Sequence, residues 1–326
     1  MIKNSKIAAL CALLAICCAM SMAFVGCNKN NEDDESVTTE VSNTKDYTDS
    51  ETESISSDSE DISDVENASE KDSEAQSNEA ATEEMTYPEP QEGTDILYEG
   101  FGKNKDYVVV IDAGHQRHGM TDKEPNGPGS DVMKAMVSSG TQGAFTGVPE
   151  YELNLAVALE LRNELMSRGY TVVMVRETHD VQVSNVGRAQ IANKYAPSEE
   201  NGYKCTINVR IHANGSENSS ASGALMCSPT KDNPYKIGEL YEECLALANA
   251  IIDPYCEATG VNKRASHILY GDNMTGTNWC EVPTTILEMG FMTNEGDDTL
   301  MQSEGFNRKA ALGVSDGIEA FFEAYR

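Results

Sequence analysis

The sequence has little basic charge, few histidines and few aromatic side chains. Its 326 residues include 24 Lys and Arg against 54 Asp and Glu, which gives a formal net charge of −30, and they contain 5 His and one Trp. No stripe of Lys and Arg occurs in the second half of the chain, so the charge pattern argues against a nucleic acid partner. No internal repeat indicates a separate binding module.

Large apolar side chains are nearly absent between residues 28 and 92. This segment consists mostly of Ser, Thr, Asp, Glu and Asn and carries most of the negative charge. It cannot bury enough surface to offset its ordering entropy, so we expect a disordered linker over residues 27–97 rather than an acidic binding tail. A flexible coil of this length spans roughly 45 Å, and like charges extend it further.

The first 26 residues have the pattern of an export signal. Lys3 and Lys6 precede an apolar run over residues 7–25. The run ends at FVGC, which resembles the lipobox of bacterial lipoproteins, with Cys27 as the lipidated first residue of the mature chain, although Phe24 stands where an aliphatic residue is usual. The alternative is an uncleaved membrane anchor. In both cases we expect the rest of the chain to lie outside the cytoplasm, tethered to the cell membrane.

The cysteines beyond residue 27 lack the spacing of a structural zinc cluster. No two of them form a Cys-x-x-Cys pair. Their number is odd, which leaves the disulfide pairing open. We expect buried thiols with at most one disulfide, and the alternative is a catalytic cysteine paired with His267. These five cysteines are Cys205, Cys227, Cys244, Cys256 and Cys280.

Residues 98–326 have the composition of one globular domain. Apolar runs of strand length alternate with helical patterns, which predicts an α/β domain of three layers, with a mostly parallel, twisted sheet of about six strands covered by helices on both faces. The expected strands are residues 107–112, 171–176, 205–212, 223–227, 266–270 and 283–289. The expected helices begin near Glu150, where Leu153, Val157, Leu161 and Leu165 repeat every four residues up to Gly169, and cover residues 185–195, 237–259 and 306–325.

Three polar residues mark the carboxyl ends of expected strands. His115 follows the first strand, His212 ends the strand CTINVRIH, and Glu288 ends the run PTTILE. Ligands of parallel sheets gather at this edge. One histidine there is more often an ordinary hydrogen-bonded residue, but two histidines and a glutamate together favour a catalytic or metal site.

Four blocks of the sequence carry a family resemblance. VVVIDAGHQ, VPEYELNLAVAL, NVRIHANGS and PTTILEMGFMTN occur in this order, with VRETHDVQVSNVGRAQIAN between them. Together they resemble the zinc-dependent N-acetylmuramoyl-L-alanine amidases of the amidase-3 type, over about residues 107–326. The chain departs from the family at Ala113, at Gln116 and in a longer segment between His115 and Glu150, so we expect the loop, but not the ligands, to differ from the family.

The resemblance implies a residue-by-residue assignment. His115, Glu150 and His212 match the family's zinc ligands, and Glu288 matches its catalytic glutamate. Two imidazoles and one carboxylate leave a position open for water, as in catalytic zinc sites. Glu288 would take a proton from this water and pass it to the leaving amine. From the spacing alone, Glu150 could equally serve only to cap its helix.

Other titratable residues compete for these roles. His118, three residues after His115, could replace a ligand or contact substrate. His179 and His267 have no partner at metal spacing. Glu152 is the nearest rival of Glu150 but points to another face of the helix. Asp112 is better suited to orient His115 or its loop as a hydrogen-bond acceptor than to bind metal.

The segment over residues 116–148 has the composition of a long loop. Because it joins His115 to Glu150, it must flank the proposed metal, and we expect either a lid or groove wall that contacts substrate or a disordered insertion. The function implied is zinc-dependent hydrolysis of the bond between N-acetylmuramic acid and L-Ala in peptidoglycan by a monomeric enzyme. The alternatives are a zinc peptidase acting within the stem peptide and a non-catalytic, wall-binding lipoprotein.

Overall fold

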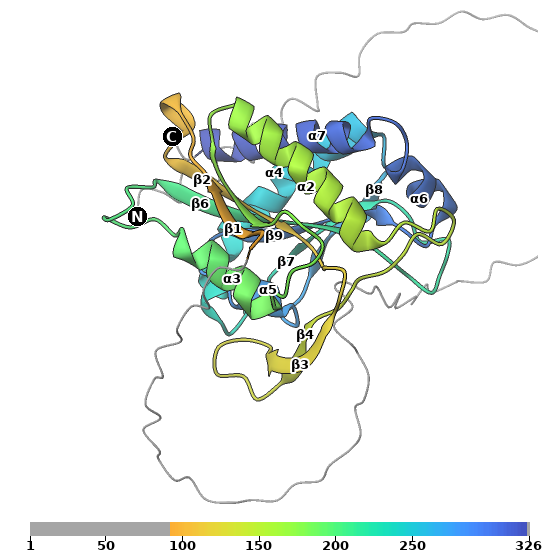
Figure 1. Cartoon of the computed structure of the whole chain (residues 1–326), viewed down its shortest axis with the longest axis horizontal. Coiled ribbons are helices and arrows are strands. Elements are labelled where there is room, and N and C mark those ends of the chain that lie inside the picture. Colours follow the sequence, from red (N-terminus) through yellow and green to blue (C-terminus); the bar gives the residue numbers. More distant parts are fainter. Residues whose placement is uncertain (1–91, 325–326) are drawn as a thin grey trace, which may run out of the picture. The chain divides into compact units, whose positions relative to one another are not determined.

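The computed structural model describes residues 92–324 (Figure 1). The expected export signal, Cys27 and most of the expected linker lie outside these residues. Within the described part, no helix combines the length and apolar character needed to span a bilayer.

A seven-stranded sheet forms the centre of the domain, in the order β1-β5-β2-β6-β9-β7-β8. The neighbours from β5 to β9 are parallel, as are β7 and β8, whereas β1 pairs with β5 and β7 with β9 in antiparallel fashion. The prediction of a mostly parallel sheet is confirmed, with one strand more than expected. The strands are β1 (Thr94–Tyr98), β2 (Tyr107–Ala113), β5 (Thr171–Arg176), β6 (Cys205–Asn214), β7 (Ala224–Ser228), β8 (Lys263–Tyr270) and β9 (Thr284–Phe291).

Helices cover both faces of this sheet, as the alternating pattern predicted. In Figure 1, α2, α4 and α7 lie on one side, where they share the largest apolar core with the sheet, and α3 and α5 lie on the other. The α-helices are α2 (Glu150–Ser167), α3 (Asn185–Lys194), α4 (Tyr241–Thr259), α5 (Thr275–Asn278), α6 (Glu295–Met301) and α7 (Phe306–Glu323), and the 3-10 helices are η1 (Gly102–Asn104) and η2 (Lys236–Leu240).

Helix α2 shows how the apolar repeat determines packing. Leu153, Val157, Leu161 and Leu165 are all at most 3% exposed and belong to the largest core. The helix ends at Ser167, and the predicted stop, Gly169, lies two residues further on with a φ of +85° that only glycine accepts without strain. The buried apolar side chains pack α2 against the core along the length of the helix. This packing holds the first residue of the helix, Glu150, at the edge of the sheet.

Two parts of the fold differ from the sequence-based expectation. The expected domain boundary at residue 98 falls inside the sheet, because β1 pairs with β5 from Thr94 onward. The segment over residues 116–148 contains an antiparallel hairpin of β3 (Met120–Pro125) and β4 (Met133–Val137). Both were missed because their strands are only five or six residues long, and TDILY, MTDKEP and MKAMV lack the regular alternation of apolar and polar residues that predicts a half-buried strand.

Candidate metal centre and active site

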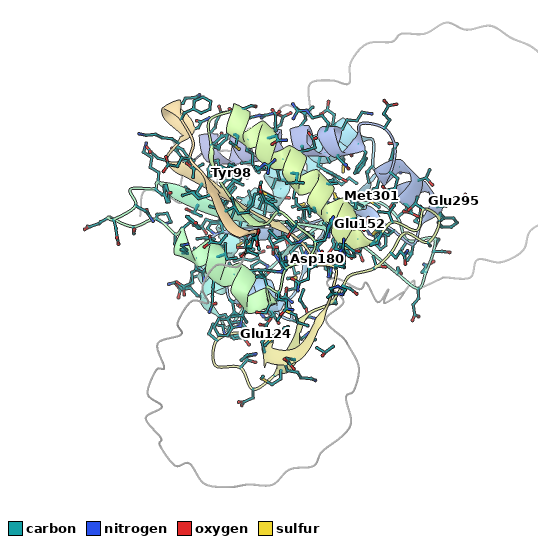
Figure 2. The ribbon with its side chains drawn as sticks, viewed as in Figure 1. Tyr98, Glu124, Glu152, Asp180, Glu295 and Met301 are labelled. Atoms are coloured by element: carbon teal, nitrogen blue, oxygen red, sulfur yellow. The ribbon has the colours of Figure 1, made fainter. Side chains whose placement is uncertain are left out.

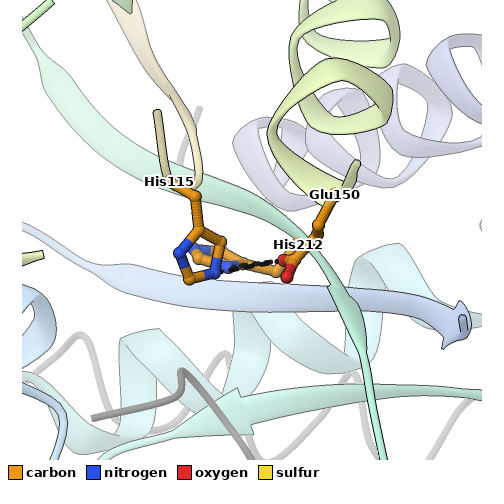
Figure 3. A group of neighbouring side chains, drawn as sticks. All are labelled: His115, Glu150 and His212. Atoms are coloured by element: carbon orange, nitrogen blue, oxygen red, sulfur yellow. Dashed lines mark ion pairs between the residues drawn. The ribbon is translucent and has the colours of Figure 1, made fainter. Parts of the chain in front are cut away.

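The structure brings His115, Glu150 and His212 together at the carboxyl edge of the sheet (Figure 3). One nitrogen of each imidazole and one carboxylate oxygen of Glu150 lie within 4.8 Å of one another, and all three residues are buried. His115 follows β2, Glu150 begins α2, and His212 lies in β6. The described residues contain one such group of potential metal ligands.

The contacts within this group centre on one carboxylate oxygen. Glu150 Oε1 lies 3.2 Å from His115 Nε2 and 3.3 Å from His212 Nδ1. The two imidazole rings are nearly perpendicular, with centroids 4.8 Å apart. Burial raises the pKa of Glu150, but the charge of His115 and hydrogen bonds from both histidines outweigh it and hold this pKa well below its usual value. Glu150 is therefore an anionic centre between two imidazoles.

Neighbouring backbone and amide groups fix the orientation of Glu150. Its Oε2 accepts a hydrogen bond from Thr141 N at 2.9 Å, and its Oε1 accepts bonds from Asn154 Nδ2 and Ala213 N, each at 3.1 Å. Asn154 lies one turn further along α2. The carboxylate of Glu150 is therefore fixed by hydrogen bonds from other segments as well as by its own helix. Its role is more than the helix capping that its spacing also allowed.

His115 is held in a conformation that few residues with a side chain adopt. Its φ is +58°, in the left-handed region. Its Nδ1 lies 3.1 Å from the carbonyl oxygen of Ser138 and 3.0 Å from Ser138 Oγ, and in the tautomer with the hydrogen on Nδ1 it donates to the carbonyl oxygen. A cation would take the place of the hydrogen between Nε2 and Glu150 Oε1, which lie 3.2 Å apart, and in this tautomer it would bind the lone pair of Nε2.

Two glycines make room for the group. A Cβ at Gly114 would lie 2.2 Å from the His212 ring. A Cβ at Gly140 would lie 2.7 Å from Glu150 Oε2, and Gly140 also has a φ of +82°. Both positions require glycine for the close approach of backbone to the site.

The donors match the requirements of a zinc ion. Zn²⁺ binds imidazole nitrogen and carboxylate oxygen, and three protein ligands leave a fourth tetrahedral position open. The buried, anionic carboxylate between two imidazoles offers a cation both charge compensation and ligand atoms. The residues present therefore fit a zinc ion.

Glu288 lies beside His212 in the sheet. The two residues are in register on the parallel strands β6 and β9, so their side chains extend from the same face of the sheet. Glu288 is 1% exposed. A carboxyl group at this place is a neighbour of the candidate metal centre and not one of the three grouped ligands.

The segment over residues 116–148 contacts both ends of the candidate centre, as its position in the sequence predicted. Ser138 binds His115, and Thr141 binds Glu150. The hairpin within this segment packs against the domain, since Glu124 Oε1 accepts a hydrogen bond from Val186 N and Pro125 O accepts one from Trp279 Nε1 at 2.9 Å. Figure 2 labels Glu124 at the hairpin. A wholly disordered insertion is therefore wrong for this segment.

The competing residues lie elsewhere or serve other contacts. Glu152, labelled in Figure 2, is exposed, and so is His118. His179 is half-buried, with its ring against Tyr151, and His267 lies in the edge strand β8. Asp112 binds two buried arginines, Arg188 and Arg210.

The cysteines of the described part occur as thiols. Four are buried, and burial raises the pKa of Cys244 to about 12 and that of Cys280 to about 11. A thiol with a raised pKa is a poor nucleophile, so the expectation of buried thiols is confirmed and a catalytic cysteine is disfavoured.

Sequence reasoning missed the residues that hold the candidate ligands in place. Ser138, Thr141 and Asn154 contact His115 or Glu150 directly, and Arg176 and Arg188 bind the backbone around them. The relevant signal for the arginines was their place in the Arg-containing block VRETHDVQVSNVGRAQIAN, which runs from the end of β5 into α3. Their backbone contacts could not be read from it.

Comparisons with known proteins agree on one family. The model of the amidase-3 family, N-acetylmuramoyl-L-alanine amidase, matches residues 109–320. An N-acetylmuramoyl-L-alanine amidase of Mycobacterium tuberculosis is 27% identical over 225 residues, which cover 66% of this chain and 86% of the relative.

Solved structures have the same fold. The N-acetylmuramyl-L-alanine amidase Ami1 from Mycobacterium abscessus superposes with a TM-score of 0.57 at 25% identity, covering 68% of this chain and 100% of that one. Ami1 from Mycobacterium smegmatis gives a TM-score of 0.58 at 22% identity, covering 67% and 97%. The similarity covers the described domain and not the first third of the chain.

Proposed function

The chain belongs to the amidase-3 family of N-acetylmuramoyl-L-alanine amidases, and from this premise we propose that it hydrolyses peptidoglycan with a single zinc ion held by His115, Glu150 and His212. The observation that carries the proposal is the convergence of two imidazoles on one buried, ionised carboxylate. The enzyme cleaves an amide bond, between N-acetylmuramic acid and L-Ala of the stem peptide in the activity that gives the family its name.

Each of the three residues has a distinct part in holding the ion. His115 would bind through Nε2, because Nδ1 is engaged with Ser138. His212 and Glu150 would complete the set, with the backbone amides of Thr141 and Ala213 fixing the carboxylate. A bound zinc ion supplies Lewis acidity, which polarises the amide carbonyl and lowers the pKa of a water molecule towards about 7.

We assign the proton transfers to Glu288. Its carboxylate would accept a proton from the attacking water and deliver it to the amide nitrogen, which leaves only when protonated. The register with His212 supports this role, because it puts the carboxyl group next to the ligand set without making it a ligand. Burial beneath the surface keeps bulk water from competing for this proton.

The N-terminal third of the chain defines where the enzyme works. An amidase that cleaves peptidoglycan acts outside the cytoplasm. We propose that Cys27 carries a lipid anchor and that residues 27–91 form a charged, extended linker, so that a monomeric catalytic domain reaches the wall from the membrane. The basis is the sequence pattern of residues 1–92.

Product analysis tests the reaction and its metal dependence together. Purified cell walls treated with the zinc-loaded full chain should show new L-Ala amino termini and glycan strands without peptides, and no new reducing sugars. Chelated protein should leave the walls unchanged, and added zinc should restore the products. New termini within the stem peptide would instead identify a peptidase, and full activity after chelation would contradict the proposed zinc dependence.

Substitution of the proposed base separates its role from that of the ligands. We expect Glu288→Gln to lower kcat about 100- to 10,000-fold, because the amide can neither accept nor deliver the proton, while the zinc content stays at one per chain. Metal analysis and turnover on cell walls measure both. Glu152→Gln is the matched control, since this exposed glutamate should leave both quantities unchanged. Turnover of Glu288→Gln at the wild-type rate would refute the assignment.

A further inference from the structure

Arg176 is a buried guanidinium whose hydrogen bonds go to backbone carbonyls. It is the last residue of β5 and is 0% exposed. Its Nε donates to Ala113 O at 2.8 Å, its Nη2 to Gly114 O and Tyr151 O at 2.9 Å each, and its Nη1 to Thr178 O at 3.1 Å. The fork geometry of arginine allows one side chain to bind these four oxygens at once.

Two of these carbonyls belong to residues next to candidate metal ligands. Gly114 immediately precedes His115, and Tyr151 immediately follows Glu150. These two ligands come from segments 35 residues apart by their numbers (150 − 115), and one nitrogen of Arg176 binds the backbone of both. Arg176 therefore bridges the turn after β2 and the first turn of α2.

A second arginine, Arg188, binds the backbone of the same turn, including that of His115. Arg188 Nη2 donates to His115 O at 2.9 Å, and its Nη1 donates to Ala113 O at 2.9 Å and to Asp112 Oδ1 at 2.5 Å. The carbonyls of Ala113, Gly114 and His115 are thus all bound by guanidinium groups. A left-handed non-glycine residue such as His115 persists only where its surroundings determine its conformation, and these bonds supply that constraint.

The charge of Arg176 is costly where it lies. The oxygens that accept its hydrogen bonds are neutral carbonyl oxygens, and none belongs to a carboxylate that would neutralise the positive charge. Burial, together with the nearby Arg188, lowers the pKa of Arg176 to about 9. An apolar residue would avoid the cost of burying a charge. The arrangement is better explained by the geometry that it imposes than by a gain in stability.

We propose that Arg176 is a positioning residue that sets the spacing of His115 and Glu150 through the carbonyls of Gly114 and Tyr151, with Arg188 fixing the turn that carries His115. The inference rests on the proposed function, since the spacing matters for a bound metal ion. The two arginines of the Arg-containing block would thus increase metal affinity without binding the metal or the substrate themselves.

Arg176→Lys keeps the positive charge but removes the bridge, because a single ammonium cannot reach four carbonyls in the fork geometry. We expect the zinc affinity of the folded full chain to fall roughly 10- to 100-fold, as is typical when a group that orients metal ligands is lost. Competition with a chromogenic chelator measures this affinity. Bound Co²⁺ serves as a second probe, and its visible absorption per bound ion should change because the ligand geometry changes.

Arg168→Lys is the matched control. Arg168 lies at the far end of α2, is largely buried and binds the carboxylates of Glu164, Asp316 and Glu319. It should keep wild-type zinc affinity and the wild-type Co²⁺ spectrum. A control that loses affinity as much as Arg176→Lys would overturn the positioning role, because the loss would then reflect general destabilisation.

The outcomes separate this inference from the proposed function. Wild-type zinc affinity and Co²⁺ spectrum in Arg176→Lys would overturn the positioning role alone. A wild-type chain that binds no zinc through His115, Glu150 and His212 would overturn both. If Arg176→Lys does not fold, Arg188→Lys carries the test: it retains the bridge to Tyr151 but loses the bond to His115 O, and zinc binding as tight as in the wild type would overturn the proposal.

Discussion

The two faces of strand β6 are equally buried but differ in chemistry. All ten of its residues are buried. One alternate set is apolar and belongs to the core beneath α2, α4 and α7, and the other set is polar and leads to the candidate metal centre. The apolar set is Cys205, Ile207, Val209, Ile211 and Ala213, and the polar set is Thr206, Asn208, Arg210, His212 and Asn214.

The comparison shows that burial alone does not separate core from site. An apolar face is stabilised in proportion to the area that it removes from water, and similar side chains can replace one another there. A buried polar face is stable only if each group finds its partner, so every position depends on named neighbours. Arg210, for example, pairs with Asp112 at 2.8 Å.

The largest loss of stability should come from breaking the ion pairs of the polar face. Asp112 is 1% exposed and binds Arg188 and Arg210. We expect Asp112→Asn to lower the free energy of unfolding by about 3–5 kcal/mol at pH 7, because two buried guanidinium groups lose their carboxylate. Urea unfolding measures the change. Asp180→Asn, in the exposed pair with Arg117, is the control and should change little.

The pH dependence of this loss follows from the pKa of Asp112. Burial raises this pKa, but the charges of Arg188 and Arg210 outweigh burial and hold it well below its ordinary value. A carboxyl group with a lowered pKa in the folded state contributes stability above its unfolded pKa, about 3.9, and loses it as the pH falls towards the folded value. The difference between wild type and Asp112→Asn should therefore shrink below about pH 4. A constant difference from pH 7 to pH 3 would contradict this explanation.

The sequence predicted the buried apolar strands more completely than the polar side chains around the site. Apolar runs located six of the seven strands of the sheet, because burial on both sides of a parallel sheet produces continuous apolar segments. Strand β1 was missed because its first residues continue a polar, acidic segment. For the site, the family motif singled out His115, Glu150 and His212, which the structure brings within 4.8 Å.

The polar neighbours of the site could not be predicted in the same way. Arg176 ends a strand and Arg188 lies in a helix, and a charged residue at either place is ordinarily solvent-exposed. Their burial depends on carbonyl groups from β2 and α2, which are distant in the sequence. Such contacts between backbone and side chain leave no periodic signal.

A smaller loss of stability should follow from adding one polar group to the apolar face. Val209 is 0% exposed within the largest core. We expect Val209→Thr, which keeps the shape and adds a hydroxyl, to lower the free energy of unfolding by about 1–3 kcal/mol, because the hydroxyl is buried among apolar side chains. Zinc affinity and amidase turnover should stay at wild-type levels. A variant as stable as the wild type would show that this face accepts polar groups and would remove the distinction between the two faces.

The smallest effect should come from the reverse exchange on the polar face, Thr206→Val. Thr206 Oγ1 donates to Tyr195 O at 2.6 Å, and its replacement by an isosteric methyl removes that one bond at a cost of about 0.5–1.5 kcal/mol. Thr206 lies six residues before His212 (212 − 206), or roughly 20 Å along the strand, so turnover should not change. Unfolding and wall-hydrolysis assays on the same preparation measure both. A tenfold loss of turnover with intact stability would mean that the polar face acts on the site as one connected unit, whereas the expected result limits the functional part of this face to the carboxyl end of β6.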